Sequence, residues 1–149
     1  MPQSFISFHY HIVFSTKNRE PWISHTIENR LWEYLGGIIR GLGGVPLSIG
    51  GVEDHIHMLV QLQQDRAFQD VLRELKAVSS GWVRKTFPGL VDFRWQIGYA
   101  AFTVSHSHLT AVSSYITTQR EHHKQESGLE ELIRLLQKHE MPFREEYLQ

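Results

Sequence analysis

In the segment that follows Gly50-Gly51, apolar residues recur at every second position, at Ile56, Met58, Val60 and Leu62. This period of two predicts a β-strand with that face in a core. His55 and His57 then share the opposite face, where residues two apart lie roughly 6.5–7 Å from each other. Two imidazoles at that spacing can bind one divalent ion, so the strand is a candidate metal site.

Spacing alone does not single out this histidine pair. The same H-x-H pattern occurs at His9–His11 and at His106–His108, and any of the three pairs can equally be two surface histidines. Ser105 or Ser107 is expected to cap a helix. That expectation disfavours His106–His108, because residues i and i+2 of a helix do not share a face.

Composition limits the class of protein. The chain has 149 residues, 41% of them hydrophobic and 21% charged, as expected of one soluble globular domain. It has no cysteine, which excludes disulfides and thiolate metal sites and fits a cytoplasmic protein. We expect no membrane span. A net charge of −1 disfavours indiscriminate coating of nucleic acid but leaves room for a local basic groove.

Apolar periodicity and turn residues predict the order of elements. We expect a strand over 5–14 and then a helix that is capped by Ser24 or Thr26 and ends at Gly41 and Gly43-Gly44. A strand over 45–49, the histidine strand and a helix from Asp65 to Pro88-Gly89 should follow. The rest should contain strand residues within 93–105, interrupted at Gly98, a helix after Ser105 or Ser107, and a last helix from the Ser127–Glu130 capping box to Pro142. Gly36-Gly37, inside the first helix, suggests close backbone packing against something, such as a second subunit.

This order predicts a ferredoxin-like (RRM-like) α+β fold, an antiparallel sheet with helices on one face. The face of Ile56 should meet the helices. The face of His55 and His57 should then be open, so that a ligand or another helix can approach it. We expect residues 1–126 to form the catalytic part and 127–149 a C-terminal helix and tail of the same domain.

The third helix carries candidate polar partners for the histidines. Its apolar stripe, Leu109, Val112 and Ile116, is continued by Gln119 and His123, with Tyr115 and His122 on its edge. Tyr115 and Gln119 are four residues apart and are therefore neighbours on the helix surface. A buried glutamine needs a partner for its amide. A metal held by the two histidines is one such partner, and a backbone group is the other.

Together these segments carry a family resemblance. The sequence Gly51-Val52-x-Asp54-His55-Ile56-His57-Met58-Leu59, followed by Ser114-Tyr115-Ile116-x-x-Gln119-x-x-His122-His123, resembles the single-tyrosine HUH transposases. These are small transposases of insertion sequences that move as single-stranded DNA, with relatives associated with repetitive extragenic palindromes (REP). The segments Tyr10–Lys17 and Trp95-Gln96-x-Gly98-Tyr99 are similar too, so the resemblance covers nearly the whole chain.

The resemblance implies roles for particular residues. Tyr115 would be the nucleophile, forming a 5′-phosphotyrosine bond, and His55, His57 and Gln119 would bind a divalent metal, Mg²⁺ or Mn²⁺. The DNA would be single-stranded with a hairpin. A homodimer is implied as well, with the histidines of one subunit completed, in some states, by the tyrosine helix of the other.

Further residues are expected close to the site or to DNA. Asp54 is either a support for a histidine or a plain turn residue, and His11, His122 and His123 are site-adjacent. The candidate phosphate contacts are Lys17, Arg19, Arg73, Lys76, Arg120 and Lys124. Such charges on a helix more often form a solvated face.

Three other functions remain open at this stage. A domesticated, catalytically silent homodimer of the same fold would bind DNA or RNA without cutting it. A metal-dependent nucleotide hydrolase of the histidine-triad kind would want another histidine where this chain has Leu59. A purely structural ferredoxin-like dimer would not need Gln119.

Overall fold

A computed structural model describes residues 3–148. The elements are β1 (His9–Ser15), a 3₁₀ turn (Lys17–Arg19), α1 (Glu28–Gly41), β2 (Val45–Gly51), β3 (His55–Gln61), α2 (Phe68–Thr86), β4 (Ala100–Thr103), a 3₁₀ turn (His106–His108), α3 (Leu109–Thr117), α4 (Gln119–His122), α5 (Gly128–Lys138) and a 3₁₀ turn (Glu145–Tyr147). Within this described part, no helix has the length and apolar composition needed to cross a membrane.

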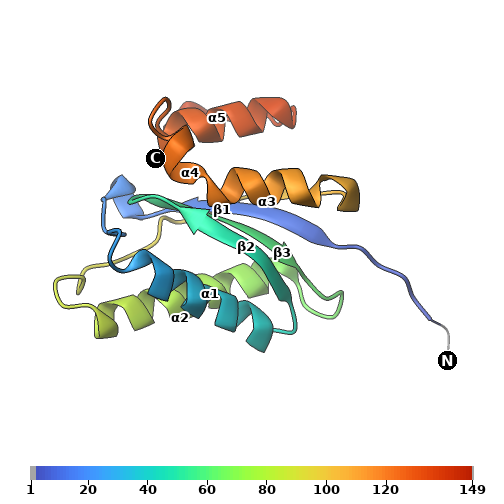
Figure 1. Ribbon diagram of the computed structural model, residues 1–149, viewed down its shortest axis with the longest axis horizontal. Coiled ribbons are helices and arrows are strands. Elements are labelled where there is room, and N and C mark those ends of the chain that lie inside the picture. Colours follow the sequence, from blue (N-terminus) through green and yellow to red (C-terminus); the bar gives the residue numbers. More distant parts are fainter. Residues whose placement is uncertain (1–2, 149) are drawn as a thin grey trace.

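The strands form one four-stranded antiparallel sheet in the order β2-β3-β1-β4. Its central pair, β1 and β3, aligns Ser15 with His55 and Val13 with His57. Helices α1 and α2 cover one face of this sheet, and α3, α4 and α5 lie on the other (Figure 1). The predicted α+β fold, with a tyrosine-bearing helix set against the sheet, is confirmed.

The main core lies between the sheet and the pair α1–α2. Ile56, Met58 and Val60 of β3 are fully buried there, as the period of two predicts. They pack with apolar side chains from the neighbouring elements, namely Ile12, Phe14, Leu31, Leu35, Ile39, Leu72, Leu75 and Phe93. This core therefore fixes the position of the histidine strand β3 relative to α1 and α2.

The opposite face is covered, and here the expectation of an open face is wrong. His55 is 2% exposed and His57 is 0% exposed. A second apolar cluster explains the difference, because Val13 and Phe102 of the sheet pack against Leu135 and Leu136 of α5. The last helix is amphipathic and buries its leucines against the apolar residues that β1 and β4 place on that face.

Other boundaries differ in detail. The expected third helix is broken at Thr118, whose φ of −109° and ψ of 29° leave the helical region. Neither Ser24, Thr26 nor Asp65 caps its helix, since α1 and α2 begin after Ile27 and Ala67 with no side-chain cap in the described chain. The Ser127–Glu130 capping box at the start of α5 is confirmed.

The segment after α2 contributes less strand than expected. Only Ala100–Thr103 forms β4, and Trp95 makes a single bridge to Thr16. Lys76 of α2 holds the intervening residues, because its ammonium donates to the carbonyls of Gln96 (2.6 Å) and Gly98 (2.7 Å).

Two glycines show where backbone packs closely. A Cβ on Gly50 of β2 would overlap the carbonyl oxygen of Ile116. The backbone of α3 therefore lies directly against the edge strand β2 at Ile116, the residue that follows Tyr115. Gly36 faces Pro46 and Ile49 of β2 at ordinary contact distances, whereas a Cβ on Gly37 would meet nothing within 4 Å. Gly36 therefore packs within the chain.

We expect Gly50→Ala to lower the free energy of unfolding by about 2 kcal/mol, because the added methyl group must push α3 away from β2. Gly37→Ala is the matched control. It adds a methyl in open space within a helix and should raise stability by up to about 1 kcal/mol. Urea unfolding of both variants measures the difference, and equal stabilities would contradict the close approach of α3.

Candidate active site

Four side chains from three parts of the chain meet above the sheet. His55 and His57 come from β3, His123 follows α4, and Glu131 belongs to α5. One oxygen of Glu131 lies 2.8 Å from His57 Nε2, 3.0 Å from His123 Nε2 and 3.2 Å from His55 Nε2. One ligand atom of each of the four residues lies within 4.8 Å of the others. We call these four residues the histidine–glutamate cluster.

Gln119 also points its amide oxygen into this cluster. Its Oε1 lies 3.0 Å from His123 Nε2 and 3.4 Å from His55 Nε2. Its Nε2 donates to the carbonyl of Tyr115, so the amide has a partner on both sides. The backbone partner that the sequence left open is therefore present for the amide nitrogen, and the amide oxygen lies beside two imidazoles.

Tyr115 reaches the same carboxylate from α3. Its hydroxyl donates to the second oxygen of Glu131. Arg134, one turn further along α5, donates to the phenolic oxygen at 2.7 Å and is itself paired with Glu126. The phenol therefore lies between a carboxylate and a guanidinium, and Glu131 links it directly to the histidines.

Burial and hydrogen bonding together shift the pKa values of these groups, in different directions for different groups. Burial alone would raise the pKa of Glu131, but hydrogen bonds from His123, His55 and His57 hold that pKa well below its usual range. Burial opposes protonation of His55, yet hydrogen bonds to Asp54 and Glu131 raise its pKa to about 9. Burial and the Glu131 carboxylate raise the pKa of the Tyr115 phenol, which is therefore protonated in this arrangement.

Two neighbours orient the imidazoles. Asp54 Oδ1 lies 2.7 Å from His55 Nδ1, and His11 Nε2 lies 2.7 Å from His57 Nδ1. With their Nδ1 atoms engaged, both β3 histidines turn Nε2 toward Glu131. Burial is the main reason that the pKa of His11 falls to about 3, so His11 is neutral and its Nε2 can accept a hydrogen bond from His57 Nδ1.

His122, also predicted to be site-adjacent, lies beside the Tyr115 ring. The ring of His122 lies 4.5 Å from the ring of Tyr115, at an interplanar angle of 32°. His123, predicted only as site-adjacent, is one of the four members of the histidine–glutamate cluster.

Most of the predicted phosphate contacts are engaged with protein groups. Their partners are Leu148 for Arg19, Asp70 for Arg73, Gln96 and Gly98 for Lys76, Glu28 and Glu53 for Arg120, and Glu121 for Lys124. Lys17 has no such partner among residues 3–148. Exposed pairs such as Arg73–Asp70 cost little to exchange for phosphate, whereas Lys76 and Arg120 each join separate elements.

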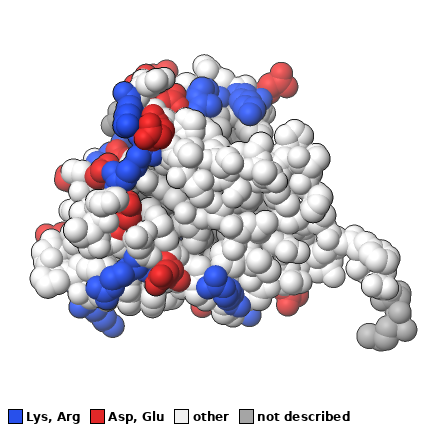
Figure 2. All heavy atoms as spheres, in the orientation of Figure 1, with Lys and Arg blue, Asp and Glu red and all other residues white. Residues whose placement is uncertain are grey.

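The charges on the surface agree with the low net charge. Figure 2 shows Lys and Arg side chains interspersed with Asp and Glu along one side and over α5, while a broad area over α3 and the adjoining strands carries none. A continuous basic band is not present on the face in this view. Binding of DNA through this face would depend on local contacts rather than on bulk charge.

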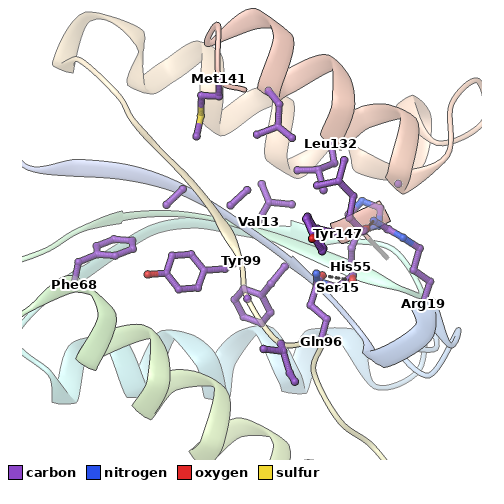
Figure 3. A pocket seen from close by; sticks show the side chains of 18 residues that line it. Val13, Ser15, Arg19, His55, Phe68, Gln96, Tyr99, Leu132, Met141 and Tyr147 are labelled. Atoms are coloured by element: carbon purple, nitrogen blue, oxygen red, sulfur yellow. Dashed lines mark hydrogen bonds between the residues drawn. The ribbon is translucent and has the colours of Figure 1, made fainter. Parts of the chain in front are cut away.

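A cavity of about 490 Å³ adjoins the cluster at His55. Figure 3 shows its apolar walls, with Val13, Leu132 and Met141 on one side and Phe68 and Tyr99 on the other. Gln96 forms its floor, where its side-chain oxygen accepts hydrogen bonds from Ser15. Tyr115 does not line this cavity.

Glu131 and Arg134 were not predicted as site residues. A signal was available, because Glu131 lies four residues before Leu135 and therefore on the buried stripe of α5. An acidic residue on such a stripe needs a partner. The sequence alone does not say where that partner lies.

The donor set fits a divalent metal ion. Imidazole nitrogens together with amide or carboxylate oxygens suit ions from Mn²⁺ to Zn²⁺, and the ligand atoms already converge. Asp54 engages the Nδ1 atom of His55, as carboxylates do for metal-ligating histidines.

The structure places His55 and His57 on the central strand β3, facing Tyr115 on the adjacent helix α3, as the resemblance to the single-tyrosine HUH transposases implied. The sequence profile of the IS200-like transposases matches residues 4–119. The chain belongs to this family, whose members cleave and transfer DNA.

Individual relatives agree. The ISDra2 transposase TnpA of Deinococcus radiodurans is 23% identical over 117 residues, which is 75% of this chain and 84% of that protein.

A stretch of 81 residues is 40% identical to a leucine–tRNA ligase of Frankia alni. That stretch makes up 7% of the ligase, so we assign none of its activity to this chain.

Solved structures show the same fold. A crystallised transposase of Deinococcus radiodurans R1 has a TM-score of 0.63 at 21% identity, covering 78% of this chain and 94% of that one. A REP-associated tyrosine transposase bound to a REP hairpin has a TM-score of 0.56 at 16% identity, covering 78% of this chain and 70% of that one.

We expect Glu131→Ala to lower the stability of the metal-free protein by about 3 kcal/mol, because three buried imidazoles lose their common partner. Glu121→Ala, at an exposed pair, should change stability by less than about 0.5 kcal/mol. Urea unfolding in the presence of a chelator compares the two. A small, equal effect would place Glu131 outside the cluster.

Proposed function

We propose that this transposase cuts and rejoins single-stranded DNA through a covalent bond between Tyr115 and a 5′-phosphate. The observation that carries the proposal is the position of the Glu131 carboxylate. One of its oxygens lies 2.8 Å from His57 Nε2, and the other accepts a hydrogen bond from the hydroxyl of Tyr115. The candidate nucleophile, Tyr115, and the candidate metal ligand His57 thus contact the same side chain.

The proposed reaction is a transesterification. The phenolic oxygen of Tyr115 forms a bond to phosphorus, and the bond from phosphorus to the 3′-oxygen of the preceding nucleotide breaks. The phenol loses its proton, and the departing 3′-oxygen gains one. Rejoining reverses these steps with a 3′-hydroxyl as the attacking group. Because the phosphodiester is exchanged for another ester of similar energy, no nucleotide cofactor is needed.

His55, His57 and Gln119 are the proposed protein ligands of a divalent metal, with Mn²⁺ favoured over Mg²⁺ by the imidazoles. Such an ion, when bound, polarises the scissile phosphate and offsets the charge that develops on it. Asp54 and His11 keep the two histidines in the ligating orientation. His123 and Glu131 are close enough to contribute further donors.

Arg134 and Glu131 act on the phenol in opposite ways. The Arg134 guanidinium favours the phenolate, while the Glu131 carboxylate disfavours it. The Arg134 guanidinium, 2.7 Å from the phenolic oxygen, is thus the group of this site that favours loss of the phenolic proton.

The DNA partner is proposed to be a single strand with a hairpin. The solved relative bound to a REP hairpin supports this proposal. Lys17, together with the exchangeable pairs at Arg73 and Lys124, is a candidate for phosphate contacts. Hairpin shape and unpaired bases, rather than charge, would then supply selectivity.

We further propose a homodimer. The edge strand β2 carries partly exposed apolar residues, Val45 and Leu47, which support this proposal. Within each chain, Tyr115 already lies against that chain's own histidines. The site is therefore proposed to work in cis in this arrangement.

The function is tested with single-stranded oligonucleotides copied from the DNA that flanks the gene, labelled on both sides of the suspected junction. We expect an adduct, dependent on Mn²⁺ or Mg²⁺, that carries the fragment on the 3′ side. Tyr115→Phe should abolish it, because the attacking oxygen is removed, and His57→Ala should abolish it through loss of a ligand. Tight hairpin binding with no adduct would instead favour the catalytically silent homodimer.

Mixing the two inactive variants tests the cis arrangement. If each chain completes its own site, a mixture of Tyr115→Phe and His57→Ala should form no adduct after subunit exchange. Recovery of adduct formation would show that subunits share their sites. Analytical ultracentrifugation of the same samples checks that dimers are present.

A further inference from the structure

A second cavity, of about 420 Å³, opens directly beside Tyr115. It lies between the end of β4, α3 and the C-terminal half of α5. Its lining residues are His11, Phe102, Thr103, Val104, Ser105, His108, Ala111, Val112, Tyr115, Arg134, Leu135, Lys138 and His139. We call it the tyrosine-side cavity. A volume of this size is typical of sites for small organic ligands.

The ionisable groups around this cavity favour an anion. Arg134 and Lys138 are its cations, and none of its lining residues in the described chain is Asp or Glu. Arg134 also pairs with Glu126, but Lys138 has no ion pair among residues 3–148. His108 adds a ring whose Nδ1 is engaged by Ser105 at 2.7 Å.

The walls of the cavity suit a flat ring. Phe102 and His139 stack with 4.3 Å between their ring centroids and 18° between their planes. Phe102 is buried and fixed in the sheet by the pairing of β4 with β1, where it lies opposite His11. Ala111, Val112 and Leu135 complete an apolar surface. Aromatic walls beside cationic groups bind nucleotides through stacking and phosphate contacts.

We propose that the tyrosine-side cavity binds the nucleotide that follows the scissile phosphate, the one whose 5′-phosphate becomes attached to Tyr115. The proposal rests on the function proposed above. Lys138 and Arg134 would contact phosphate oxygens, and the base would lie against Phe102 and His139.

The geometry of phosphoryl transfer selects this nucleotide. In an in-line displacement, the leaving 3′-oxygen departs on the side of phosphorus opposite the attacking phenol. The nucleotide that leaves is thus directed away from Tyr115. The nucleotide that stays is bound to the same phosphorus as the phenol, and the tyrosine-side cavity adjoins that phenol.

The cavity at His55 fits this nucleotide less well. Arg19 is the one Lys or Arg side chain in its lining and already donates to the carbonyl of Leu148, and the lining imidazole of His55 is already paired with Asp54 and Glu131. Tyr115 is not part of the lining. The cavity is therefore separated from the attacking oxygen, and its lining offers little positive charge to a phosphate.

The binding experiment uses the full-length protein and thymidine 5′-phosphate, followed by protein NMR. We expect chemical-shift changes at α3, the end of β4 and the C-terminal half of α5. Lys138→Glu should weaken binding about tenfold through repulsion of the phosphate, while Lys85→Glu, on α2 across the sheet, should leave it unchanged. Unchanged shifts elsewhere in the spectrum confirm that each variant is folded.

Inorganic phosphate and thymidine alone serve as probes of the two halves of the site. Each should bind more weakly than the nucleotide. Equal binding of phosphate would show an anion site without base recognition and overturn the proposal. Equal effects of the two lysine variants, or shifts at another surface, would overturn it as well.

A cleavage experiment separates this proposal from the function on which it rests. An oligonucleotide with an abasic first position after the junction should show a KM raised about tenfold with wild-type protein, since it lacks the stacking base. Lys138→Glu should raise the KM for the intact oligonucleotide. Normal adduct formation without either penalty would refute the cavity proposal alone. If the protein binds the nucleotide but forms no adduct with any DNA, the cleavage function is refuted. The cavity would then be a nucleotide-binding site in a protein that does not cut DNA.

Discussion

The carboxylate of Glu131 connects helices α3 and α5 to the histidine strand β3. A buried carboxylate is costly unless its oxygens are paired, and here three imidazoles and one phenol pair them. The same contacts join α5 to β3 and α3, which are far apart in sequence. The arrangement of the catalytic candidates is therefore a consequence of satisfying one charge, and the apolar contacts of Leu135 and Leu136 bring that charge to its place.

The sequence predicted those features that depend on local pattern. Alternation marked β3 and its buried face, and the resemblance paired His55 and His57 with Tyr115 and Gln119, which the structure brings together. It could not predict that α5 covers the histidines, because an amphipathic helix shows that it packs but not where. Glu131 was missed for a related reason: a single acidic residue on a charged helix looks like part of a solvated surface until its partners are placed.

The match to the IS200-like transposases ends at Gln119, yet the site does not. His123, Glu131 and Arg134 follow that limit and contact the residues within it. The site thus combines residues within the part of the chain that matches the family with residues of the C-terminal helix α5, which contact Tyr115. Differences between relatives in this helix would alter the surroundings of Tyr115 without changing its histidines or its fold.

The contact of Gly50 with the carbonyl of Ile116 has a consequence for how the site tolerates change. Two backbones in direct contact cannot move closer, and no side chain lies between them to be repacked. The smallest distance that α3 can have from β2 is thus set by atomic radii. Smaller apolar residues elsewhere on α3 would leave a cavity and would not let the phenol move closer to the histidine strand.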